Sequence, residues 1–256
     1  MILTSCRHPN YKMLANVHID ESRETAITNT SNIPGVVIYT NRSDFEHGIG
    51  AAVIMIKNDT TVRRLKYYLG SDLRHTVYEA EAQAVILALH LAANIKEPRT
   101  HLTIGTDNQA ILLGMKNQRP KPSHYLLDKI HDSLEAFQVV QARLRGIQVK
   151  GYRKDKGQMK LTDGSTGWKD WKLKQRHKVT FVWTPGHKGI SGNEIADKEA
   201  KLAAQGESSP SHDLPTFLRK KPLPVSISAM LNWRPITGPT GHQLSLISEL
   251  SIQPLS

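Results

Sequence analysis

The sequence predicts a mixed α/β fold in which helices cover a five-stranded sheet, and three observations lead to this prediction. Three β-rich segments follow one another with short turns at residues 36–39, 48–57 and 61–69. A helical period then takes over at residues 77–95, which are rich in Ala and Leu. After that helix, single strands alternate with further helices. Strands joined by short turns favour an antiparallel meander, and the later alternation favours a layered sheet flanked by helices.

The hydrophobic pattern places each element in order. The run VVIY at residues 36–39 is β-branched and aromatic, which is typical of a buried strand. We expect the last helix to end at Gly206, because glycine commonly follows a helix C-terminus. The elements predicted after the meander are helix 77–95, strand 101–106, a short helix after it, helix 124–145, strand 178–184 and helix 191–206.

Both ends of the chain differ in composition from this patterned region. Residues 1–33 are polar and weakly patterned, and they end before a Pro34-Gly35 break, so we expect a leader or linker. Residues 207–256 are rich in Ser, Pro and isolated apolar residues, and we expect them to be mostly extended or disordered. The folded domain is therefore expected to span residues 34–206.

A basic stretch at about residues 146–177 interrupts the predicted domain as an insertion. It is dense in Lys and Arg, including Lys154 and Lys156, and it contains Trp168 and Trp171. One interpretation is a solvated, disordered loop. The other is a nucleic-acid grip in which the cations neutralise phosphates and the indole rings stack on bases.

The composition narrows the classes of partner and compartment. The 256 residues carry a formal net charge of +11 and have a sequence pI near 9.7. Such a balance favours a polyanionic partner, of which nucleic acid is the commonest, although a merely soluble basic protein is the alternative. The single cysteine, Cys6, excludes an internal disulfide and fits a reducing compartment. Without a secretory signal or an apolar run of roughly 20 residues, we expect an intracellular protein, cytoplasmic or nuclear, with no membrane partner.

Two carboxylates stand where a simple fold would not require them. Glu81 falls on the face of helix 77–95 that should be buried, and a buried carboxylate needs a cationic partner or a metal. The alternative is a glutamate at the helix rim beside a lysine. Glu79 lies on a different face and is expected to be solvated. Asp107 follows strand 101–106, where an N-cap is one interpretation and a ligand site at the strand end is the other.

The C-terminal part of the domain adds two further candidates. Asp197 lies inside helix 191–206, where a surface acid near lysines is the alternative, and His187 lies in a loop flanked by glycines. Neither residue is specific alone. Together with Asn41 at the end of the first strand, these positions form a constellation that suits the oxygen-preferring ion Mg²⁺. Two such ions would clamp a phosphodiester displacement, and a basic protein with that site would cut nucleic acid.

Four segments closely resemble the signature blocks of type 1 ribonuclease H domains. They are YTNRS with GIGAAVI, TVYEAEAQAVILALHL, IGTDNQAIL, and VWTPGHKGISGNEIADKEAKLAA. The resemblance covers roughly residues 34–205 apart from the basic stretch, and it is strongest to the domains of fungal non-LTR retrotransposon polyproteins. It implies a ribonuclease H-like five-stranded mixed sheet, endonucleolytic hydrolysis of the RNA strand of RNA–DNA hybrids, and two Mg²⁺ ions, for which Mn²⁺ can substitute. A monomer is the expected state, although the sequence does not determine it.

The resemblance also implies roles for individual residues. Glu81, Asp107 and Asp197 match metal-binding catalytic acids of the family. His187 matches a loop histidine that assists proton transfer or product release. Asn108 and Gln109 are candidates, by position, for contacts to the RNA 2′-hydroxyls in the wide minor groove of the duplex.

The chain departs from the family where the family has Asp-Gly-Ser and this chain has Asn41-Arg42-Ser43. The missing aspartate is the acid that bridges both ions, whereas Asn41 offers an amide oxygen without a charge. Arg42 adds a bulky cation beside the site. Three hypotheses remain open: an active nuclease that tolerates the amide, a non-catalytic hybrid-binding relic of a retroelement ribonuclease H, and an unstable remnant.

Overall fold

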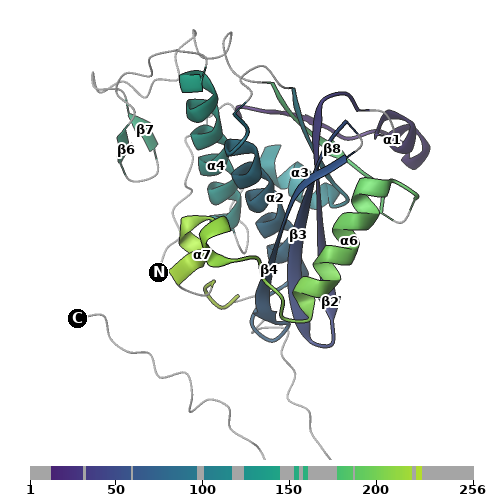
Figure 1. Cartoon of the computed structure of the whole chain (residues 1–256), viewed down its shortest axis with the longest axis vertical. Coiled ribbons are helices and arrows are strands. Elements are labelled where there is room, and N and C mark those ends of the chain that lie inside the picture. The colour runs from purple at the N-terminus through teal and green to yellow at the C-terminus, as the bar shows by residue number, and fades with distance from the viewer. Residues whose placement is uncertain are drawn as a thin grey trace, which may run out of the picture.

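A six-stranded mixed sheet forms the centre of the computed structural model (Figure 1). The structure describes residues 13–30, 33–58, 60–96, 101–116, 124–144, 153–155, 158–160, 178–186, 188–220 and 223–226. The central sheet contains β1 (Asn16–His18), β2 (Val36–Phe45), β3 (Gly48–Lys57), β4 (Thr60–Ser71), β5 (Leu102–Thr106) and β8 (Val179–Trp183). The α-helices are α1 (Arg23–Thr30), α2 (Val77–Ala93), α3 (Gln109–Lys116), α4 (His124–Leu144), α6 (Ser191–Ala204) and α7 (Thr216–Lys220).

The strand order is β1-β8-β5-β2-β3-β4. The predicted meander is confirmed, because β2 pairs antiparallel with β3 and β3 pairs antiparallel with β4. β5 runs parallel to both β2 and β8. The predicted number of strands is wrong: β1 adds a sixth strand, parallel to β8, from the segment that was expected to be a leader or linker.

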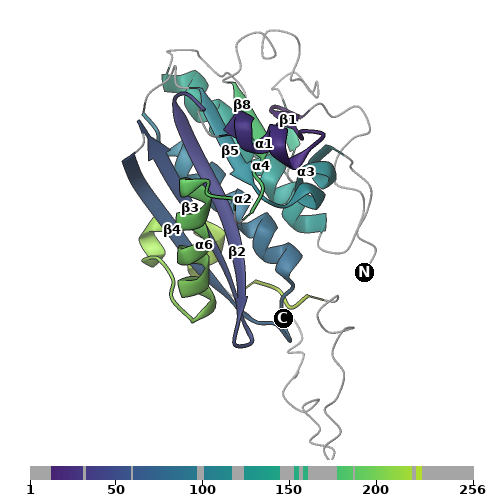
Figure 2. The ribbon, with the colours of Figure 1, turned by 90° about the vertical axis from the view of Figure 1, so that its right-hand side faces the viewer.

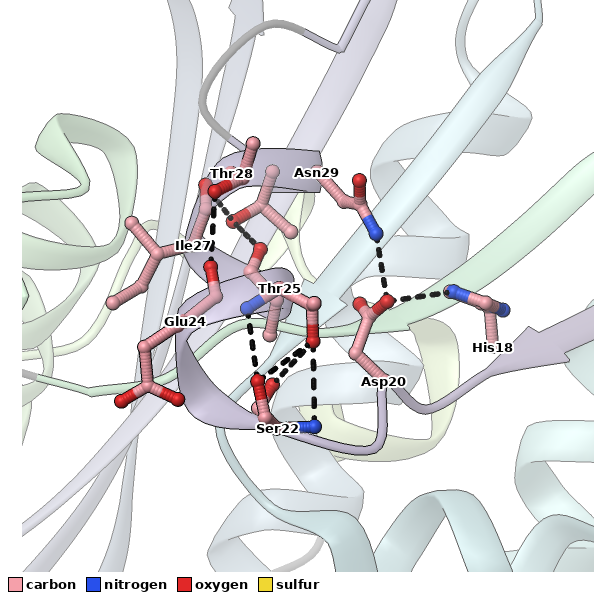
Figure 3. Close-up of polar contacts among 10 residues, drawn as sticks. His18, Asp20, Ser22, Glu24, Thr25, Ile27, Thr28 and Asn29 are labelled. Carbon is pink, nitrogen blue, oxygen red and sulfur yellow. Dashed lines mark hydrogen bonds and ion pairs between the residues drawn. The ribbon is translucent and has the colours of Figure 1, made fainter.

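Polar side chains link β1 to α1 (Figure 3), while Val17 and Ile19 of the same segment pack against the larger core. At the start of α1, the backbone N–H of Thr25 donates to Ser22 Oγ at 3.1 Å, and the N–H of Ser22 donates to Thr25 Oγ1 at 3.3 Å. Asp20 Oδ1 accepts a hydrogen bond from Asn29 Nδ2 at 2.7 Å and lies 3.0 Å from His18 Nε2. The Ser22–Thr25 bonds satisfy donors at the helix N-terminus, and they act together with the burial of Ala26 to order this segment.

Helices cover the two faces of the sheet in separate layers (Figures 1 and 2). α6 packs on β2 and β3 from one side, while α2 packs on the same strands from the other side and α4 lies behind α2. Alternate side chains of β2 pack against the helices on opposite faces of the sheet. Val36 and Ile38 join the larger core with α2 and α4, whereas Val37 and Tyr39 join a smaller core with Ala196 of α6. Successive residues of a strand point to opposite faces, so this alternation also decides where the next β2 side chains lie.

The start of α2 corrects the expectation for Glu79. This residue is buried, with 1% of its surface exposed, rather than solvated. Its carboxylate accepts from the backbone N–H of Thr76 at 2.8 Å, and its own N–H donates to Thr76 Oγ1 at 3.3 Å. The Thr-x-x-Glu spacing is the sequence signature of such a reciprocal cap. It stands at the start of the predicted helix, so this contact of Glu79 could have been predicted from the sequence.

The first part of the C-terminal tail is packed, whereas the sequence predicted mostly extended or disordered chain. A 3₁₀ turn at Ser211–Asp213 leads into α7. The apolar side chains of Leu214, Leu218 and Leu223 are buried in the larger core. Within the tail that was predicted to be mostly extended or disordered, Ser211–Asp213 and Thr216–Lys220 are therefore helical, and the residues after 226 lie outside the described part of the chain.

The basic insertion is described only in a short hairpin. β6 (Arg153–Asp155) pairs antiparallel with β7 (Gln158–Lys160) as a separate two-stranded sheet. The other residues of the stretch 146–177 lie outside the described part of the chain, so both interpretations of this stretch remain predictions. Among the helices that the structure describes, none has the length and apolar character required to cross a membrane.

Candidate active site

The ends of β5 and β8 meet the middle of β2 at one edge of the sheet. Thr40 of β2 is in register with Thr106, the last residue of β5, and Thr106 is in register with Trp183, the last residue of β8. Asn41 and Asp107, which follow the first two of these residues, therefore lie next to each other along neighbouring strands. The carboxyl ends of parallel strands are common ligand sites in α/β proteins, because loops diverge there.

An open depression of about 270 Å³ lies at this edge of the sheet. Its walls come from Arg42, Glu81, Asp107, Asn108, Gln109 and Trp183. The structure thus brings together five of the residues that the sequence singled out, from β2, from α2 and from the β5–α3 junction. It adds Trp183, which the sequence analysis did not select, although its place at a strand end just before Thr-Pro-Gly was a usable signal.

Glu81 is buried on the inner face of α2 and pairs with Arg42. Only 1% of its side chain is exposed, and Oε1 accepts from Arg42 Nε at 3.0 Å. Its second oxygen, Oε2, is buried and has no hydrogen-bond partner among the described residues. The alternative of a rim glutamate beside a lysine is therefore wrong, because the side chain is buried and its cationic partner is an arginine of β2.

The surroundings of Glu81 make its carboxyl group a weak acid. Burial is the largest effect and the Asp107 carboxylate the second, and together they raise the pKa of Glu81 to about 8. Arg42 and a hydrogen bond from Asn108 act in the opposite direction. Glu81 therefore changes its protonation state close to neutral pH.

This shift predicts how the stability of the protein depends on pH. Because the folded-state pKa lies above the unfolded value, stability from the protonated carboxyl is fully present below about pH 4.5 and is lost as the pH rises through about 8. Glu81→Gln cannot ionise, so we expect it to gain roughly 1–3 kcal/mol relative to the wild type between mildly acidic and mildly alkaline pH. Urea unfolding across that range measures the difference.

Asp107→Asn provides the matched control for this measurement. It removes the neighbouring negative charge that helps to raise the pKa of Glu81, so the loss of stability should move to lower pH. A difference between wild type and Glu81→Gln that stays constant with pH would show that burial does not hold the proton on Glu81.

Asp107 does not cap the helix that follows it. Asn108 does, because its Oδ1 accepts from the backbone N–H of Ile111 at 3.1 Å. The main chain at Asp107 is held by Trp183, whose indole N–H donates to the Asp107 carbonyl oxygen at 3.1 Å. A Cβ added at Gly186 would lie 3.2 Å from Asp107 Oδ2, so the loop after β8 passes directly beside this carboxylate. The N-cap interpretation is wrong, and the Asp107 side chain lines the depression.

Asn41 does not line the depression, and its amide oxygen is engaged locally. Oδ1 accepts from the backbone N–H of Arg42 at 2.8 Å, and the residue is only 4% exposed. By the alternation along β2, Asn41 is on the α6 side of the sheet and Arg42 is on the α2 side with Glu81.

Asp197 does not line this depression. It lies on α6 and pairs with Lys201 Nζ at 2.7 Å, which is the contact expected under the alternative of a surface acid near lysines. Lys154 lies on β6. The other candidates, His187, Lys156, Trp168 and Trp171, lie outside the described residues. Their functional roles stay predictions.

The described residues fit one divalent ion rather than two. Glu81 and Asp107 supply two carboxylates, including the buried Oε2, and Mg²⁺ in proteins is often held by one or two carboxylates together with substrate phosphates. The other two candidate ligands are engaged elsewhere. The side-chain oxygen of Asn41 accepts a hydrogen bond from a backbone N–H, and Asp197 pairs with a lysine. Within the described part of the chain, no three His, Cys, Asp or Glu side chains gather in a way that could hold a metal.

Comparison with known protein families identifies the domain that contains this depression. A family model described as RNase H matches residues 34–205, which is more than half of the chain. The chain belongs to the RNase H family. No curated protein sequence matches the chain significantly.

Solved structures similar to this RNase H domain include three enzymes named RNase H1. That of the halophilic archaeon Halobacterium salinarum is 15% identical, with 67% of this chain and 98% of that chain covered and a TM-score of 0.38. LC9-RNase H1, described as a type 1 RNase H with the type 2 active-site motif, is 20% identical, with coverages of 70% and 76% and a TM-score of 0.42. LC11-RNase H1 in complex with RNA/DNA hybrid is 16% identical, with coverages of 66% and 98% and a TM-score of 0.38. At these identities and scores, the family assignment rests on the match to the family model.

Proposed function

We propose that this RNase H domain binds RNA–DNA hybrids and hydrolyses the RNA strand with the help of a divalent ion held by Glu81 and Asp107. One observation carries the proposal: carboxylates from α2 and from the end of β5 meet in one open depression, beside the amides of Asn108 and Gln109. The ion is Mg²⁺, for which Mn²⁺ can substitute. When bound, such an ion would stabilise the negative charge of the reacting phosphate and activate a water molecule.

The residues around the two carboxylates have distinct tasks in this proposal. Asn108 and Gln109 present amide donors and acceptors to the 2′-hydroxyl groups by which a protein distinguishes RNA from DNA. Trp183 fixes the main chain of Asp107 through its indole N–H. His187 follows Gly186, which passes beside Asp107, and it would carry a proton to or from the reacting group. Asp197 would support a second ion only after separating from Lys201.

The rest of the chain supports binding through charge. The net charge of +11 favours the phosphate backbone of a nucleic acid. We assign the grip on the duplex to the basic insertion, with Lys154, Lys156, Trp168 and Trp171. A monomer in the cytoplasm or nucleus, descended from a fungal non-LTR retrotransposon polyprotein, is the biological setting that the sequence resemblance suggests.

Cleavage of an end-labelled RNA–DNA hybrid in Mg²⁺ and in Mn²⁺ tests the proposal. The wild-type chain should give RNA products, and Asp107→Asn should reduce the rate by about 100-fold or more, because one of two ion-holding carboxylates is lost. Asp44→Asn is the matched control, since Asp44 is an exposed acid of the same β2 strand that does not line the depression. Equal rates for wild type and Asp107→Asn would rule out this site as the source of activity.

A second function, hybrid binding without hydrolysis, is favoured by the contacts of Asn41 and Arg42. Asn41 has an amide where the family has a carboxylate, and its side-chain oxygen accepts a hydrogen bond from a backbone N–H. The guanidinium of Arg42 pairs with Glu81. Under this alternative the chain would retain hybrid affinity that falls steeply with added salt, and no product would form in either ion. Binding that is insensitive to salt would exclude it.

A further inference from the structure

The arginine of β2 supplies a positive charge at the carboxylate that the proposed function assigns to a divalent ion. Arg42 Nε lies 3.0 Å from Glu81 Oε1, and Glu81 is almost fully buried while the arginine side chain is 40% exposed. Among the residues that line the depression, Arg42 is the one with a permanent positive charge. The acids that face it there are Glu81 and Asp107.

The local backbone keeps this arginine directed to Glu81. The N–H of Arg42 donates to Asn41 Oδ1, Arg42 is in register with Ala51 of β3, and β2 is paired with β5 up to Thr40. A paired strand does not shift its register easily, so the side chain leaves the sheet on the α2 face, where Glu81 is fixed by the helix. The guanidinium of Arg42 and a divalent cation would therefore interact with the same carboxylate.

We propose that Arg42 is an internal cation that competes with divalent ions for Glu81 and so lowers the affinity of this site for them. The inference rests on the proposed function in that it concerns the same two carboxylates. A guanidinium that is hydrogen-bonded to a carboxylate neutralises part of the negative charge of that carboxylate. It also repels a second cation placed a few ångströms away. Because arginine stays protonated at every physiological pH, the competing positive charge itself does not depend on pH.

The competition has a functional consequence for this chain. A nuclease with this site would need a higher concentration of divalent ion than one with a small neutral residue at position 42. Only one nitrogen of the guanidinium has a protein partner among the described residues, so the N–H groups of the terminal nitrogens can donate to a nucleic-acid phosphate instead. The phosphate backbone would then draw Arg42 away from the carboxylate that the ion requires.

Calorimetric titration with Mn²⁺, in the absence of nucleic acid, tests the proposal. Arg42→Ala should bind Mn²⁺ at least about tenfold more tightly than the wild type, whereas Arg42→Lys, which keeps the charge, should stay within about threefold. Arg63→Ala is the matched control, because Arg63 is an exposed arginine of β4 that does not line the depression, and its affinity should be unchanged. Adding Glu81→Gln to Arg42→Ala should remove the gain.

Three outcomes would overturn the proposal. They are an Arg42→Ala chain that binds Mn²⁺ no more tightly than the wild type, a gain that persists after Glu81→Gln, and a failure of both chains to bind. Arg42→Gln retains an amide donor for Glu81 without the charge, and it replaces Arg42→Ala if that chain does not fold. Because the titration contains no nucleic acid, its result is independent of whether the chain hydrolyses hybrids.

Discussion

The double substitution Asn41→Asp and Arg42→Gly is expected to raise the rate of RNA hydrolysis in a hybrid by about 100-fold or more over the wild-type chain in Mg²⁺. Asn41 is next to Asp107 across the β2–β5 pairing, because the residues before them, Thr40 and Thr106, are in register. The first change places a third carboxylate at this edge of the sheet. The second removes the cation from Glu81. Single-turnover cleavage of a labelled hybrid measures the rate.

The two single substitutions separate these contributions. Each alone should give a smaller gain, because the other obstacle remains. Asp107→Asn added to the double variant should return the rate to the wild-type level or below. A folded double variant that binds hybrid but cuts no faster than the wild type would place the defect elsewhere, for example at Asp197, which pairs with Lys201.

Stability provides a second readout for the double variant. Without divalent ions, three neighbouring carboxylates and no arginine should make the chain less stable than the wild type, because like charges repel in a partly buried site. Mg²⁺ should then raise the melting temperature of the variant more than that of the wild type, since a ligand that binds only the folded state stabilises it.

The sequence predicts the two acids of the depression but not the contact that modifies them. Glu81 on an inner helix face and Asp107 after a strand are visible from periodicity, because both patterns relate residue spacing to a face or an end. The Arg42–Glu81 contact joins residues of different elements. It depends on which face of β2 carries Arg42 and on how closely α2 approaches, and neither is fixed by local spacing.

The same distinction explains the errors in the predicted fold. The meander, α2, α4 and α6 have long periodic patterns, and their types and order are as predicted. β1 has three residues, of which the outer two are exposed, so its place in the sheet depends on backbone pairing with β8. Leu214, Leu218 and Leu223 are isolated in a polar segment, and only the surface of the folded domain gives them a common burial site.

Gly50→Ala is expected to destabilise the protein by about 3 kcal/mol, which corresponds to a fall in melting temperature of roughly 10 °C. α6 lies unusually close to β3 because the helix presents alanines to a strand with glycines. A Cβ at Gly50 would lie 2.3 Å from the backbone nitrogen of Ala204 and 2.6 Å from the backbone oxygen of Ala200. Backbone atoms of a helix cannot rotate away, so α6 would have to move as a unit.

The nature of this contact makes the prediction specific. Because the atoms met by the new methyl group belong to the backbone, trimming the helix side chain with Ala203→Gly should not rescue Gly50→Ala. Gly189→Ala is the control: its Cβ would meet nothing within 4 Å, and its φ of 74° should cost only about 1 kcal/mol. Thermal unfolding of the three variants measures these differences, and equal losses for Gly50→Ala and Gly189→Ala would show that the approach of α6 does not limit position 50. A displaced α6 would also move Asp197 relative to Asp107, so, if Asp197 supports a second ion as proposed, a folded Gly50→Ala chain should cut hybrids more slowly than Gly189→Ala.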